Sequence, residues 1–111
     1  MRSISAAIVI AGAMATGACD SGSTGAPTKA VCDQTLELTW DTFGQDFLQT
    51  YCVRCHQSFN NLGTVQGRSA AIDSAAGAGP AAHNTYMPES GMRPSVEERQ
   101  LLADWIACGA P

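Results

Sequence analysis

Basic residues are scarce in this chain of 111 residues, where six lysines and arginines stand against ten aspartates and glutamates. The formal net charge is −4, and loss of an N-terminal segment carrying Arg2 leaves 5 − 10 = −5. An acidic surface disfavours nucleic acid and anionic lipid as partners. If charge steers docking, the expected partner presents a basic patch. The alternative is that the acidity only keeps the protein soluble.

The sequence also lacks an apolar run long enough to cross a bilayer, which takes about 20 residues. Its longest apolar stretch, Ile4–Met14, follows the positive charge of Arg2 and precedes small residues through Ala18. This arrangement is typical of a secretory signal peptide. We therefore predict that residues 1–18 direct export.

The four residues T-G-A-C that end at Cys19 resemble a bacterial lipobox, although threonine stands where a leucine-like residue is usual. The resemblance implies that Cys19 is lipidated and anchors the protein to a membrane without spanning it. A plain secreted protein is the alternative. Residues 19–30, rich in glycine, serine and threonine, are predicted to form a flexible tether, and residues 31–111 a single domain. The expected location is the bacterial periplasm or outer surface.

No segment reads convincingly as a β-strand, whereas three segments have helical patterns, so the domain is predicted to be all-α. The first helix, residues 41–51, has a T-x-x-Q capping box at Thr42. The second, residues 64–76, is weakened by an internal glycine, and residues 75–82 after it are predicted to be a flexible loop. The last helix begins with an S-x-x-E capping box at Ser95 and ends at a glycine.

Histidine occurs only twice, and one of the two completes the motif C-x-x-C-H formed by Cys52, Cys55 and His56. Two thiols at this spacing can each add to a vinyl group of a porphyrin. The imidazole that follows is then held beneath the iron as a ligand. The motif predicts one covalently attached haem c.

Two other interpretations of the same cysteines are weaker. A structural zinc site needs four nitrogen or sulfur ligands, and would have to recruit Cys32, Cys108 or His83 at spacings that match no zinc finger or ribbon. A thioredoxin-like dithiol requires a βαβ context, which the sequence does not show. The haem interpretation is therefore preferred.

From about Thr42 to Pro111 the chain resembles a class I mono-haem c-type cytochrome. A helix, the C-x-x-C-H motif, a middle helix, a Met-Pro loop and a terminal helix occur in the order of that family. The resemblance implies a cytochrome c fold, with three or more helices around one haem. It also implies that the first and last helices cross closely, with a glycine against an aromatic ring. Gly44 and Trp105 are the matching residues here.

The resemblance further implies that Met87, directly before Pro88, is the second axial ligand of the haem iron, opposite His56. Proline stiffens the loop that carries the sulfur. Met92 is the rival, and His83 is a third candidate that is more simply an exposed loop residue. Packing is the alternative role for either methionine.

One departure from the family concerns the proline that often follows C-x-x-C-H and whose carbonyl accepts a hydrogen bond from the ligand imidazole. No proline lies between His56 and Pro80. Another carbonyl, around residues 62–64, is expected to orient His56 instead.

Two cysteines remain, Cys32 and Cys108, one near each end of the predicted domain. In an oxidising compartment such a pair is expected to form a disulfide. The alternative is two unpaired thiols.

These features predict an electron carrier rather than an enzyme, because His/Met ligation leaves no coordination position for a substrate. The expected partners are extracytoplasmic redox proteins, including respiratory membrane complexes, and the expected state is a monomer. One alternative is a peroxidase-like haem enzyme or ligand sensor with a labile sixth position. Another is a non-haem surface lipoprotein in which Cys52 and Cys55 are merely disulfide-bonded.

Overall fold

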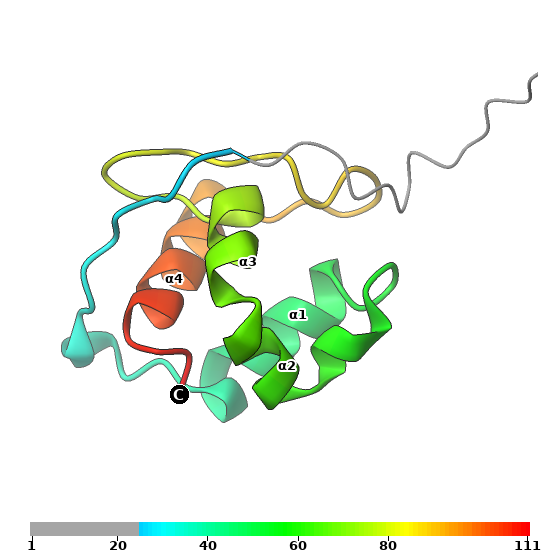
Figure 1. Cartoon of the computed structure of the whole chain (residues 1–111), viewed down its shortest axis with the longest axis horizontal. Coiled ribbons are helices and arrows are strands. Elements are labelled where there is room, and N and C mark those ends of the chain that lie inside the picture. The colour runs from blue at the N-terminus through cyan, green and yellow to red at the C-terminus, as the bar shows by residue number, and fades with distance from the viewer. Residues whose placement is uncertain (1–24) are drawn as a thin grey trace, which may run out of the picture.

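The computed structural model describes residues 25–111, so the predicted signal peptide and Cys19 lie outside it. Its elements are η2 (Gln34–Leu36), η3 (Trp40–Gly44), α1 (Gln45–Tyr51), η4 (Gln57–Asn60), α2 (Leu62–Gly67), α3 (Ser69–Ala76) and α4 (Val96–Ala107). Within this range the regular structure is all-α, as predicted, with one isolated bridge between Ala78 and His83 (Figure 1). None of the helices in the described part of the chain is long and apolar enough to traverse a membrane.

The first helical segment begins earlier than predicted, because Thr39 is its N-cap. The Thr39 hydroxyl accepts a hydrogen bond from the Thr42 backbone N–H at 3.1 Å, and the Thr42 hydroxyl accepts one from the Thr39 N–H at 2.9 Å. This reciprocal box starts the π-helical turn η3, which continues directly into α1. The predicted capping box between Thr42 and Gln45 is therefore wrong. The box lies three residues earlier, between Thr39 and Thr42, and Thr42 takes the N3 position that Glu or Gln usually fills.

The single helix predicted over residues 64–76 is two helices, α2 and α3, with a break at Arg68. The backbone of Arg68 has φ −116° and ψ 14°, and its N–H is shared between the carbonyls of Thr64 and Val65 at 3.1 Å each. Gly67, just before the break, is the weak point that the sequence indicates. Both helices still bury an apolar side chain, Val65 in α2 and Ile72 in α3.

Helix α4 begins and ends where the sequence predicts. The Ser95 hydroxyl accepts from the Glu98 N–H at 3.1 Å, and the Glu98 carboxylate accepts from the Ser95 N–H at 3.0 Å. Gly109 has φ +91°, the left-handed conformation with which many helices end. Leu102 and Trp105 on this helix are fully buried at the centre of the core.

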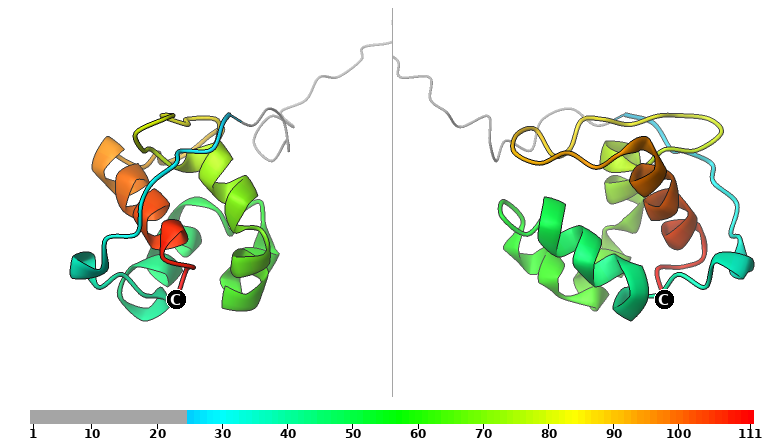
Figure 2. Two further views of the ribbon diagram at one scale, coloured as in Figure 1. Left: turned by 60° about the vertical axis from the view of Figure 1, so that its left-hand side comes forward. Right: turned by 180° about the vertical axis from the view of Figure 1, so that it is seen from behind.

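The start of the first helical segment meets α4 where Gly44 lies against Trp105. Figure 2 shows the arrangement of the helices from two further sides. A β-carbon at Gly44 would lie only 2.4 Å from Cζ2 of Trp105, so the crossing leaves no room for a side chain. The rings of Trp40 and Phe43 flank the indole, each with its centroid 6.2 Å away. The close approach expected between Gly44 and Trp105 is present. It fixes α1, and the cysteine motif that follows it, relative to α4.

Residues 25–30, called here the N-terminal strap, lie against the domain instead of forming part of a free tether. Thr28 is 1% exposed. Its N–H and hydroxyl donate to the two Asp73 carboxylate oxygens at 2.9 and 2.7 Å. The Asn84 side chain exchanges two hydrogen bonds with the backbone of Ala26, at 2.7 and 3.1 Å. The predicted domain start at residue 31 is therefore wrong, and the strap belongs to the folded unit.

The loop over residues 75–82, predicted to be flexible, is ordered by contacts from both ends of the chain. The Ala81 N–H donates to the Thr28 carbonyl at 2.9 Å, and the Ala78 N–H donates to the Arg99 carbonyl at 3.0 Å. In Figure 1 the blue strap runs beside the yellow loop that follows α3. Small residues here permit close packing: a β-carbon on Gly79 would lie 2.8 Å from the Thr28 side chain.

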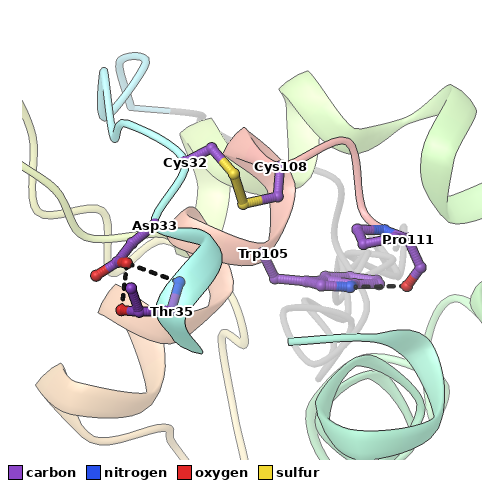
Figure 3. The surroundings of a disulfide bond; sticks show 6 residues. All are labelled: Cys32, Asp33, Thr35, Trp105, Cys108 and Pro111. Atoms are coloured by element: carbon purple, nitrogen blue, oxygen red, sulfur yellow. Dashed lines mark hydrogen bonds between the residues drawn. A yellow bond between two sulfur atoms is a disulfide. The ribbon is translucent and has the colours of Figure 1, made fainter. Parts of the chain in front are cut away.

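Cys32 and Cys108 form a disulfide, which is the predicted pairing (Figure 3). The two residues are 76 positions apart, and the bond joins the segment before η2 to the end of α4. The Trp105 indole N–H donates to the Pro111 carbonyl at 3.2 Å, so the last residues fold back toward the core.

Replacing both Cys32 and Cys108 by alanine is expected to lower the free energy of unfolding by about 4 kcal/mol, because the bond constrains a long loop of the unfolded chain. Urea denaturation followed by circular dichroism measures the difference. An unchanged unfolding midpoint would show that the bond does not stabilise the domain.

Candidate functional site

The C-x-x-C-H motif folds as a compact turn at the end of α1. The Cys52 N–H donates to the Leu48 carbonyl at 2.8 Å. The Cys55 and His56 N–H groups then donate back to the Cys52 carbonyl, at 3.2 and 2.9 Å. These local bonds bring both cysteines and the histidine to one side of a single turn. The shape of the motif is therefore determined by bonds between near neighbours in the sequence.

A cleft separates this turn from the loop before α4. Its motif wall includes Cys52, Cys55 and His56, and its opposite wall includes Met87 and Met92. The remaining lining residues are Thr50, Tyr51, Arg54, Pro88, Glu89 and Ser90. The space between the two walls, including the open mouth of the cleft, is about 490 Å³. Candidate residues far apart in the sequence thus face one space.

Arg54, inside the motif, spans the cleft to the opposite wall. Its guanidinium donates to the Ser90 hydroxyl at 2.9 Å. A β-carbon on Gly91 would lie 3.1 Å from the same guanidinium, so the loop passes close to the arginine. Gly91 itself has φ +80°, a conformation that glycine adopts without strain.

Of the three candidates for a second ligand, only Met87 both lines the cleft and has a partly buried side chain. Its side chain packs against the hydrophobic core. Its backbone is held on both sides: the N–H donates to the Ala75 carbonyl at 3.0 Å and the carbonyl accepts from Arg99 at 2.9 Å. Met92 reaches the cleft but is 69% exposed. His83 is exposed and does not line the cleft, as expected for a loop residue.

The two motif cysteines differ in state. Cys52 is a free thiol whose pKa is raised to about 12, chiefly by burial and in spite of the nearby charge of Arg99. Cys55 is disulfide-bonded.

The ring of His56 lies against the buried ring of Phe59, with centroids 5.0 Å apart and planes inclined by 21°. A carbonyl around residues 62–64 was expected to accept a hydrogen bond from this imidazole. Within residues 25–111 the structure shows no such bond, so that expectation is wrong. The stacking contact with Phe59 orients the ring instead.

The zinc and dithiol interpretations find little support in this geometry. Cys32 and Cys108, which a zinc site would have to recruit, bind one another. Within residues 25–111 no group of three or more His, Cys, Asp or Glu side chains is arranged to hold a metal. A redox dithiol needs an accessible thiolate, whereas burial keeps Cys52 protonated.

Sequence reasoning missed two groups beside the cleft. The Tyr51 hydroxyl donates to the Glu98 carboxylate at 2.8 Å. This bond is the main reason why the pKa of Tyr51 is raised. The pKa of Glu98 is lowered, chiefly by the hydrogen bond that its carboxylate accepts from the Ser95 backbone N–H.

Arg99 is the second group. Its position three and four residues before buried Leu102 and Ala103 places it on the apolar side of α4, a signal that could have been read from spacing.

Comparisons of the chain with protein-family models, with curated proteins and with solved structures found no match.

Proposed function

We propose that this protein is an electron carrier that holds one covalent haem c in the cleft between the C-x-x-C-H turn and the Met87 loop. The observation that carries the proposal is that Met87 and the motif line the same cleft. One wall offers two sulfurs and an imidazole, and the other offers a thioether on a fixed backbone. This donor set fits a c-type haem with His/Met ligation.

Each residue of the cleft has a distinct part in this proposal. Cys52 and Cys55 would form the thioether links to the haem, and His56 and Met87 would supply the nitrogen and sulfur ligands of its iron. A haem held in this way supplies a reversible one-electron iron couple, with a potential raised by the methionine. With an imidazole and a thioether of the chain both bound to the iron, no coordination position would be left for a substrate. This favours electron transfer over peroxidase-like catalysis or ligand sensing.

The chain also limits the solvent that reaches the cleft. Met87 and Tyr51 pack against the hydrophobic core and Phe59 is buried behind His56. Cys52 and Cys55 are only partly buried, so the edge next to them is the natural exit for the electron. The partners in this proposal are extracytoplasmic redox proteins, including respiratory membrane complexes. The negative charge of the chain suits a partner with a basic docking surface.

A lipid on Cys19, if export and lipidation follow the sequence pattern, would hold the carrier close to its membrane. Gly25 is already bonded to the domain through the Ser74 carbonyl at 2.7 Å. Only six residue steps separate Cys19 from Gly25, and they span at most about 20 Å when extended. The tether is thus shorter than the predicted 19–30, and partners would have to be reached near the membrane surface.

A haem stain after denaturing electrophoresis tests the proposal directly, because only covalent haem survives the gel. The full chain is produced in a bacterial host that attaches c-type haem in its periplasm. We expect a stained band at the mass of the protein. The variant C52S/C55S should lose the stain, because both thioether positions are gone.

The variant C32S/C108S is the matched control, since it removes the same number of sulfurs away from the cleft. It should keep the stain, because the gel reports the covalent bond and not the stability of the fold. A colourless wild-type band, beside a stained c-type cytochrome from the same host, contradicts the proposal and favours a non-haem protein. Rapid carbon monoxide binding by the reduced protein would instead favour a haem enzyme or sensor.

A further inference from the structure

Arg99 is the most deeply buried charged side chain in the described part of the molecule, at 2% exposure. Its Nη1 atom donates to three carbonyl oxygens: Ala76 at 3.0 Å, Asn84 at 3.0 Å and Met87 at 2.9 Å. These carbonyls come from the end of α3, the middle of the following loop and the candidate ligand itself. One side chain of α4 thus holds the whole segment that carries Met87.

The positive charge of Arg99 is not neutralised by a carboxylate. Within residues 25–111 no acidic group lies within ion-pair distance of it. Glu98, the neighbouring acid, is engaged by Tyr51 and Ser95. Burial is the main cause that lowers the pKa of Arg99, and the charge of Arg93 lowers it further. A buried cation that forms no ion pair is costly unless its environment compensates. Here three carbonyl dipoles do so, and the negative charge of Glu98 adds a smaller contribution.

The bonds of Arg99 fix Met87 together with a second set of contacts. The Met87 N–H donates to the Ala75 carbonyl at the end of α3, while the Met87 carbonyl accepts from Arg99. The Asn84 side chain ties the same loop to the backbone of Asp73 and to the N-terminal strap. The position of the Met87 backbone is therefore fixed by contacts within the protein and does not depend on a bound ligand.

We propose that Arg99 is a positioning residue for the Met87 ligand, and that its buried positive charge favours the reduced state of the haem iron. This inference rests on the proposed function. A neutral thioether binds iron more strongly when its loop is already ordered, because less conformational entropy is lost. A fixed positive charge in a poorly solvated site opposes the extra positive charge of oxidised iron.

Two variants separate these two effects. Arg99→Gln removes the charge and the three-way contact. Arg99→Lys keeps the charge, but its ammonium nitrogen is one bond closer to the backbone and does not reach the position from which Nη1 contacts the three carbonyls. Arg68→Gln is the matched control, because Arg68 is exposed at the junction of α2 and α3. The measurements are the midpoint potential and the affinity of the oxidised protein for added imidazole, which competes with Met87 for iron.

For Arg99→Gln we expect the redox equilibrium to shift at least tenfold toward the oxidised form, about 59 mV for a one-electron couple, and imidazole to bind at least tenfold more tightly. Arg99→Lys should keep a potential near that of wild type and still bind imidazole more tightly. Arg68→Gln should change neither quantity. Unchanged potential and imidazole affinity in a haem-bearing, folded Arg99→Gln variant overturn the inference.

The protein without haem gives an independent measurement. Hydrogen–deuterium exchange of residues 84–91 should become at least tenfold faster in both Arg99 variants, and exchange in α1 should not change. Equal exchange rates of residues 84–91 in wild type and in both variants would overturn the positioning role. If Arg99→Gln folds poorly, the comparison of wild type with Arg99→Lys decides the question alone. Wild-type protein without covalent haem defeats the proposed function itself, which the stained gel reports separately.

Discussion

Met87→Ala is expected to keep the covalent haem and to lose the weak long-wavelength absorption band of a methionine–iron(III) bond. Both thioether positions and His56 are untouched by the change, so attachment continues. The sixth position is then open, because Met92 is mostly exposed and His83 lies outside the cleft. The midpoint potential should fall, since methionine ligation raises it. Optical spectroscopy and potentiometric titration measure the two effects.

Met92→Ala is the matched control for this prediction. It removes the same side chain from the same loop, but from a position that is 69% exposed. We expect its spectrum and potential to match those of wild type. Should the methionine band survive in Met87→Ala and vanish in Met92→Ala, the axial ligand is Met92 and the assignment of Met87 is wrong.

Gly44→Ala is expected to lower the free energy of unfolding by roughly 2 kcal/mol even after the gain in helix propensity. The added β-carbon would lie 2.4 to 2.9 Å from three atoms of the Trp105 ring. That ring is fully buried, so it cannot move aside without disturbing the core. For a domain of this size the melting temperature should fall by about 10 °C. Thermal unfolding followed by circular dichroism measures it.

Gly67→Ala provides the comparison, because a β-carbon at Gly67 meets nothing within 4 Å. This change should leave stability equal or raise it by up to about 1 kcal/mol. If Gly44→Ala is as stable as Gly67→Ala, then the packing of η3 against α4 does not depend on the absence of a side chain at Gly44.

Local signals in the sequence predicted the elements that depend on local bonds. The capping box of Ser95 and Glu98 and the stop at Gly109 locate α4 correctly. The motif turn at Cys52 is likewise built from bonds between near neighbours. The start of the first helix was misplaced, because Thr39 and Thr42 form a box with two threonines in place of the usual pair.

Contacts between distant segments could not be predicted from spacing alone. The loop after α3 reads as flexible because it is rich in glycine and alanine. It is nevertheless held by Thr28, Asn84 and Arg99, which lie in three separate parts of the chain. The buried role of Arg99 was missed because an arginine beside two glutamates on a helix usually faces solvent. The cleft depends on these long-range bonds, whereas the motif does not.

The Cys32–Cys108 disulfide has a consequence for a chain that is cut. All residues that line the cleft, from Thr50 to Met92, lie within the covalent ring that this bond closes. A single proteolytic nick inside the ring therefore yields two fragments that stay linked as one molecule. One fragment carries the C-x-x-C-H turn and the other carries α4 with Arg99 whenever the cut falls between them. The two fragments remain covalently joined until a reducing agent breaks the Cys32–Cys108 disulfide. The two walls of the cleft therefore stay in one molecule after a cut that would divide a domain without this bond.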